Sequence, residues 1–186
     1  MKKHQHINPF TDMDRFVAGL QKEDVRYSRL TRNFQWIMWV FAPLYAAIFL
    51  LNPDKGIVMT ERIGGLCYAL AFIIFALIFR KFNNEYKSVD YGVPVVEMLT
   101  LAAKRYNMFQ RKLILIIAPI LLVDAGMVLV LMNHSGMKSV NEVILLVQEI
   151  LIPSLLIGVT IGVFIWRKRQ KPLRDAALAM LKEIES

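Results

Sequence analysis

The sequence contains few of the residues that carry catalysis or metal binding. Cys67 is the only cysteine among 186 residues, so the chain can form no intramolecular disulfide and has no cysteine pair for zinc. The three histidines are His4, His6 and His134, and two ligands on a terminal segment do not make a metal site. The motifs HExxH and GxSxG and a phosphate-binding glycine loop are also missing. We therefore expect neither an enzyme nor a cofactor-binding protein.

Acidic residues are in the minority. The chain has 15 Asp and Glu against 23 Lys and Arg, which gives a formal net charge of +8. In a soluble protein this excess would suggest nucleic-acid binding. Here 56% of the residues are hydrophobic, and basic residues also collect in the cytoplasmic loops of membrane proteins. We therefore expect no nucleic-acid partner.

Long apolar runs are the main positive feature of the sequence. Four stretches without Lys or Arg have about the length needed to cross the hydrocarbon core of a bilayer: Phe34–Leu51, Ile63–Phe79, Leu113–Met132 and Val143–Trp166. The sequence thus predicts an all-α, polytopic membrane protein. We expect four transmembrane helices arranged as two antiparallel hairpins, with the lipid bilayer as their surroundings.

The basic residues predict the orientation of these spans. In the connections and terminal segments, 20 basic residues fall on one side of the membrane and three on the other. Because Lys and Arg accumulate on the cytoplasmic side, we expect both termini in the cytoplasm and the protein in the cell or inner membrane. Lys2 and Lys3 are followed by polar residues, so we expect no cleaved signal peptide.

These boundaries divide the chain into five expected segments. Residues 1–33 are a cytoplasmic segment with an amphipathic helix, 34–79 the first hairpin, 80–112 a cytoplasmic loop with a helix, 113–166 the second hairpin, and 167–186 a cytoplasmic C-terminal amphipathic helix. Both halves follow the order of a helix and then a hairpin. A tandem duplication of a two-span hairpin is one hypothesis for this order.

The three expected cytoplasmic helices carry apolar residues at helical spacing. Pro172 suits the first position of the C-terminal helix. The three stripes are Phe16, Leu20, Tyr27, Leu30 and Phe34; Val95, Leu99, Ala102, Tyr106 and Phe109; and Leu173, Ala176, Ala177, Met180, Leu181 and Ile184. Such stripes can dock on one another, lie on the membrane surface, or fill the groove of a partner. We favour mutual docking, because an apolar stripe needs cover.

Two acidic residues interrupt the apolar runs. Asp124 lies in the third run, and Glu149 lies in the fourth with Gln148 beside it. At about 1.5 Å of helical rise per residue, both acids lie roughly 9 to 12 Å below the outer ends of their helices. Two carboxyls that share a site of low dielectric do not both ionise easily, so Asp124, Glu149 and Gln148 are a candidate proton or cation site. Alternatively, each acid only hydrogen-bonds a neighbouring helix.

Small residues follow one face of the fourth run. Ser154, Gly158 and Gly162 are spaced by four, and the two glycines form a GxxxG motif that allows another backbone to approach closely. The partner is either the second run, where Gly65 and Ala69 repeat this spacing, or the fourth helix of a second copy in a homo-oligomer. We expect the intramolecular pairing, since four helices must pack before two copies can pair.

Two classes of function fit these features. In the first, the protein is a membrane-anchored interaction or regulatory module whose basic cytoplasmic face engages a protein partner or lipid. In the second, it is a subunit of a small proton- or cation-coupled carrier or channel that uses Asp124 and Glu149. We favour the first. Ile48 follows Pro43 as Asp124 follows Pro119, so the first half lacks the matching acid that a pathway built from duplicated halves would carry.

Overall fold

A computed structural model describes residues 9–53, 56–108, 111–134 and 139–185, and every regular element within these ranges is helical. The elements are α1 (Pro9–Phe49), α2 (Met59–Lys87), α3 (Val95–Arg105), the 3-10 segment η1 (Arg111–Ile116), α4 (Ile117–His134), α5 (Val140–Ile165), the π-helical segment η2 (Trp166–Gln170) and α6 (Lys171–Glu185). The all-α class predicted from the sequence is therefore confirmed over the described residues.

Within the described residues, three stretches of helix are long and apolar enough to cross a membrane. They are Met59–Lys87, Ile114–Asn133 and Val140–Ile184, and they cover the second and fourth apolar runs and all of the third except Leu113. Most of the first run lies in α1, which does not belong to this set. Helix α1 ends at Phe49, two residues before the run does, and the polar residues Arg32, Asn33 and Gln35 stand at the start of its apolar half.

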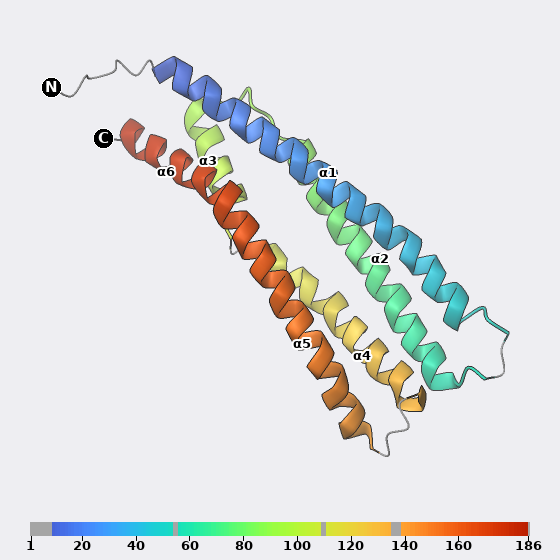
Figure 1. Ribbon diagram of the computed structural model, residues 1–186. Helices are drawn as coiled ribbons and strands as arrows, with labels where there is room; N and C mark the ends of the chain where they lie inside the picture. The colour runs from blue at the N-terminus through green and yellow to red at the C-terminus, as the bar shows by residue number, and fades with distance from the viewer. Residues whose placement is uncertain (1–8, 54–55, 109–110, 135–138, 186) are drawn as a thin grey trace.

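The long helices pack in the order α1, α2, α4 and α5 (Figure 1). The beginning of α1, the end of α6 and the short helix α3 lie together at one end of the molecule. Helix α1 has 41 residues, or about 60 Å at a rise of 1.5 Å per residue, against roughly 30 Å for the hydrocarbon core of a bilayer. One half of α1 therefore extends well beyond its apolar half and reaches α3.

Aromatic side chains fill the contact between α1 and α2. Five pairs bridge the two helices with ring centroids 5.1 to 5.6 Å apart: Tyr27–Tyr86, Phe34–Phe79, Phe41–Phe72, Tyr45–Phe72 and Tyr45–Tyr68. Aromatic pairs at this separation attract each other beyond the effect of burying their area. They occur along most of the length of α2, so α1 and α2 behave as one packed pair.

Glycines allow α2 and α4 to approach closely. A Cβ atom added to Gly64 would lie 2.9 Å from Val130 Cγ2 and 3.0 Å from the carbonyl oxygen of Gly126. A Cβ atom on Gly126 would lie 3.1 Å from the carbonyl oxygen of Gly64. The close approach that small residues permit is thus made by Gly64 and Gly126, and the neighbouring Gly65 contacts Phe49 of α1.

The small-residue face of α5 does not pack as we predicted. Ser154, Gly158 and Gly162 are exposed, and among the described residues no atom outside their own helix lies within 4 Å of a Cβ placed on either glycine. The buried residues of α5 are Val143 and Val147, near its start. The expected pairing with Gly65 and Ala69 of α2 is therefore wrong, because α1 and α4 already occupy the small-residue surface of α2.

The C-terminal helix also begins differently from the prediction. We expected a separate helix starting at Pro172, but α5, η2 and α6 form one continuous helix. In η2 the Lys171 N–H bonds the Trp166 carbonyl five residues earlier, as in a π-helical turn. Proline has no N–H to donate and its ring crowds the carbonyl four residues before it. The wider turn lets the helix continue past Pro172.

The predicted docking of the stripes is observed where α1, α3 and α6 meet. Their buried side chains form what we call the head cluster: Phe16, Leu20, Met98, Leu99, Ala102, Tyr106 and Ala177. Leu173, Ala176, Met180 and Leu181 of α6 pack against it, whereas Ile184 remains exposed. The apolar stripes of these three helices thus cover one another in part, since Leu30, Phe34 and Val95 are exposed and Phe109 lies outside the described residues.

We predict that Gly64→Ala and Gly126→Ala each destabilise the protein, by about 2 kcal/mol, because the added methyl group meets backbone that cannot move easily. For a chain of this length that is a fall in Tm of several degrees, measured by thermal unfolding in detergent. Gly158→Ala is the matched control and should leave Tm unchanged or raise it, since that position is open. Equal effects of all three substitutions would contradict the close packing of α2 on α4.

Candidate functional site

A buried carboxylate lies at the head end of α1. Asp24 is 1% exposed and follows Leu20 by four residues, so its side chain points into the same interface as the head cluster. Its Oδ2 atom accepts hydrogen bonds of 2.6 Å from Arg105 Nη1 and from the Tyr91 hydroxyl. Its Oδ1 atom accepts another of 2.6 Å from the Tyr106 hydroxyl. We call these four residues the Asp24 network.

The network joins three parts of the chain. Asp24 belongs to α1, Arg105 and Tyr106 end α3, and Tyr91 lies in the connection between α2 and α3. The Gly92 N–H donates to Asp90 Oδ1 at 2.8 Å, which shapes the turn that carries Tyr91. The Trp166 indole N–H in turn donates to the Tyr106 carbonyl at 2.9 Å. The helix that runs from α5 into α6 is therefore attached to the same group of residues.

Burial and the neighbouring Asp24 carboxylate raise the pKa of both Tyr91 and Tyr106 well above the ordinary tyrosine value. Both hydroxyls therefore stay protonated at neutral pH and donate to the carboxylate. The Arg105 guanidinium, whose side chain is 11% exposed, supplies the opposite charge. A buried charge is tolerated when it is paired and hydrogen-bonded in this way.

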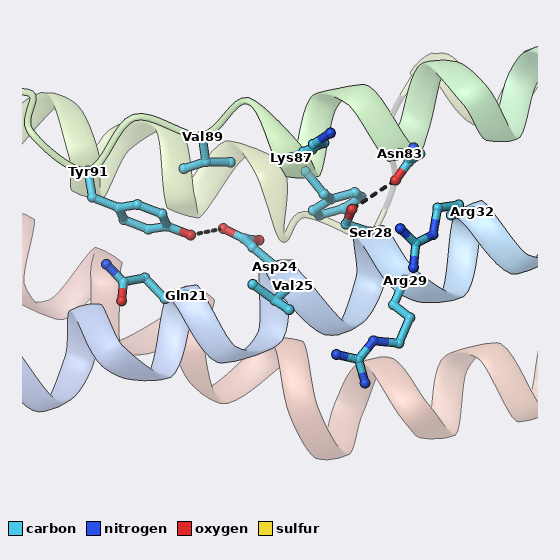
Figure 2. A pocket seen from close by; sticks show the side chains of 11 residues that line it. Gln21, Asp24, Val25, Ser28, Arg29, Arg32, Asn83, Lys87, Val89 and Tyr91 are labelled. Carbon is cyan, nitrogen blue, oxygen red and sulfur yellow. Dashed lines mark hydrogen bonds between the residues drawn. The ribbon is translucent and has the colours of Figure 1, made fainter.

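A cavity of about 510 Å³ lies beside the network, between the head ends of α1 and α2 (Figure 2). Three of its lining residues are exposed cations, Arg29 and Arg32 of α1 and Lys87 of α2. Its floor includes Ser28 and Asn83, whose side chains hydrogen-bond each other at 2.8 Å. We call these five residues the basic pocket. Since Arg105 already balances the charge of Asp24, the local charge of the pocket is positive.

The intramembrane candidates from the sequence are only partly brought together. Gln148 Nε2 donates to Asp124 Oδ1 at 2.8 Å, which links α5 to α4. Glu149 follows Gln148 by one helical position, about 100° around the helix, and is exposed. The described residues contain no group of three or more His, Cys, Asp or Glu side chains arranged to hold a metal ion. The hydrogen bond between Gln148 and Asp124 matches the alternative in which an acid fastens neighbouring helices.

Sequence reasoning missed the Asp24 network. One signal was available, because Phe16, Leu20 and Asp24 are spaced by four and the acid thus occupies an apolar position of its stripe. An acid at such a position needs a buried partner. The identity of that partner was hidden, since Arg105 lies 81 residues further along the chain.

Comparisons of this chain with protein-family models, with curated proteins and with solved structures find no match. The function is therefore argued from the residues of the chain and their arrangement.

We predict that Asp24→Asn lowers the free energy of unfolding by about 3 kcal/mol, because the buried Arg105 guanidinium would lose the carboxylate that it contacts. Thermal or denaturant unfolding in detergent measures this loss. Asp14→Asn makes the same chemical change at an exposed position of α1 and should have little effect. Similar stabilities of the two variants would show that the Asp24 network does not support the fold.

Proposed function

We propose that this chain is a four-span integral protein of the cell membrane, with both termini in the cytoplasm. In this proposal the apolar half of α1 is the first span, and the first two and last two spans form two transmembrane hairpins. The head cluster and the Asp24 network then lie on the cytoplasmic side. The distribution of basic residues supports this topology, because 20 of them lie on one side of the spans and three on the other.

The surface of α1 supports its assignment as a span. Away from α2 it exposes large apolar side chains from the start of its apolar half onward, and four of them are Trp36, Ile37, Val40 and Leu44 at 64%, 44%, 60% and 46% exposure. Contiguous apolar surface of this kind is rare on soluble proteins and is normal against lipid. Trp36 and Trp39 also suit the boundary between water and hydrocarbon.

This topology predicts opposite labelling of two engineered cysteines. In a Cys67→Ala background, a cysteine replacing Ser135, between α4 and α5, should react with a membrane-impermeant maleimide added to intact cells. A cysteine replacing Ser186 should react only after the membrane is opened. Gel-shift labelling measures both. Reaction of the two positions from the same side would contradict the proposal.

We further propose that the protein acts as a membrane-anchored interaction or regulatory module through its basic cytoplasmic face. The observation that carries this proposal is the basic pocket, in which three cations surround a cavity of about 510 Å³. The pocket is held by the Asp24 network on one side and by the paired helices α1 and α2 on the other. A rigid, positively charged hollow of this kind suits the carboxylates of an acidic segment of a cytoplasmic protein.

An acidic peptide provides the test. The full chain in nanodiscs of neutral phosphatidylcholine should bind a fluorescent peptide of ten Glu residues, with an affinity that falls as salt rises. Arg29→Ala together with Arg32→Ala should weaken binding about tenfold, equivalent to about 1.4 kcal/mol for two lost charge contacts. Fluorescence anisotropy measures the affinity.

The matched control removes the same charge from the same helix. Arg15 and Lys22 are exposed residues of α1 outside the basic pocket, and replacing both by Ala should reduce binding much less. If both double variants bind equally weakly, the attraction comes from general charge, and the pocket has no specific role.

The carrier or channel alternative has less support. It needs Asp124 and Glu149 at one site, but Gln148 reaches Asp124 while Glu149 is exposed. The interaction module is therefore the function that we propose.

A further inference from the structure

A second cavity, of about 350 Å³, lies where the end of α5 faces α1 and α2. Its walls are mostly apolar or aromatic and include Tyr27, Tyr86, Gly162 and Trp166. Thr31, Asn107 and Gln170 also line it and supply polar atoms. We call this space the interfacial cavity. It is distinct from the basic pocket, although Tyr86 lines both.

Gln170, one of the residues that line the interfacial cavity, carries an unsatisfied donor. The residue is 7% exposed, and its amide nitrogen Nε2 has no hydrogen-bond partner among the described residues. A buried polar group without a partner is costly and calls for an explanation. Gln170 is also the last residue of η2, and π-helical turns frequently occur at functional sites. Both observations point to a ligand that carries a hydrogen-bond acceptor.

The position of the cavity along α5 identifies the rest of this ligand. Trp166 lines it, and the exposed residues Arg167, Lys168 and Arg169 follow directly, as at the boundary between hydrocarbon and headgroups. Toward the other end of α5 the wall continues as Gly162 and Val159. A ligand here would have its acceptor at the boundary and an apolar chain running along α5.

We propose that the interfacial cavity binds one acyl chain of a membrane phospholipid, and that Gln170 Nε2 donates to its ester carbonyl. The ester of a phospholipid joins an acceptor to a long apolar chain at this depth of the bilayer, as the lining of the cavity requires. The proposal depends on the membrane location proposed above, but it does not depend on the basic pocket or on an acidic partner.

Lipid titration of the purified full chain tests this site. Dioleoylphosphatidylcholine added to the protein in detergent should raise Tm by several degrees and saturate near one lipid per chain, with the bound lipid counted by native mass spectrometry. Glycerophosphocholine, which has the same headgroup without acyl chains, should leave Tm unchanged. A rise with the headgroup alone would overturn the assignment to an acyl chain.

Two glycine variants separate the cavity from the general lipid surface. Gly162→Leu should fill the cavity and abolish the rise in Tm, and it should still fold because the space at this position is open. Gly158→Leu places the same side chain one turn away, outside the residues that line the cavity, and should retain the rise. Equal responses of the two variants would overturn the proposal. So would light scattering that showed a dimer broken by both substitutions, because a second copy would then cover this face.

Gln170→Leu separates binding from folding. Without lipid this variant should melt at the same temperature as the original protein or higher, since a buried unpaired donor has been removed. Its affinity for the lipid should fall about tenfold, as expected for the loss of one buried hydrogen bond. A lower Tm with unchanged lipid affinity would mean that Gln170 only supports the fold. Failure of the acidic-peptide test alone would not affect these results, because no variant used here alters the basic pocket.

Discussion

The requirement that a buried carboxylate be matched in charge and in hydrogen bonds organises one whole end of this protein. Asp24 is almost fully buried, and it takes its partners from the end of α3 and from the connection before it. One of those partners is Tyr106, whose carbonyl accepts a hydrogen bond from the indole N–H of Trp166. The apolar sides of α3 and α6 can then close on α1. A single acid on one helix thus determines where three other segments lie.

The two cavities beside this end of the protein differ in polarity. The basic pocket has cations at its edge and a small polar floor, whereas the interfacial cavity has mostly apolar and aromatic walls with one buried amide. Tyr86 separates them and contributes to both. One side of the α1–α2 pair thus presents charge, and another presents mostly apolar and aromatic surface.

Features that depend on residues close together in the sequence could be predicted, whereas contacts between residues far apart in the sequence could not. Local periodicity was sufficient for α3 and for the docking of Ala177 and its neighbours, because apolar spacing directly reveals a helix face. Of the four long apolar runs that the sequence predicts as spans, three coincide with helices in the described residues that are long and apolar enough to cross a membrane. The partner of Asp24 could not be predicted, since Arg105 meets it only after the chain has folded back. The glycines of α5 misled us because spacing alone does not say which of several small-residue surfaces will be covered first.

The continuity of two helices has a mechanical consequence. Helix α1 runs without a break from Asp24 into its apolar half, and α5 runs through η2 into α6. An α-helix turns about 100° per residue and is stiff over such lengths. The two ends of such a helix therefore move together, so a tilt or rotation of one end also tilts or rotates the other. A force applied to the apolar half of either helix would therefore be transmitted along the helix to the residues of the Asp24 network.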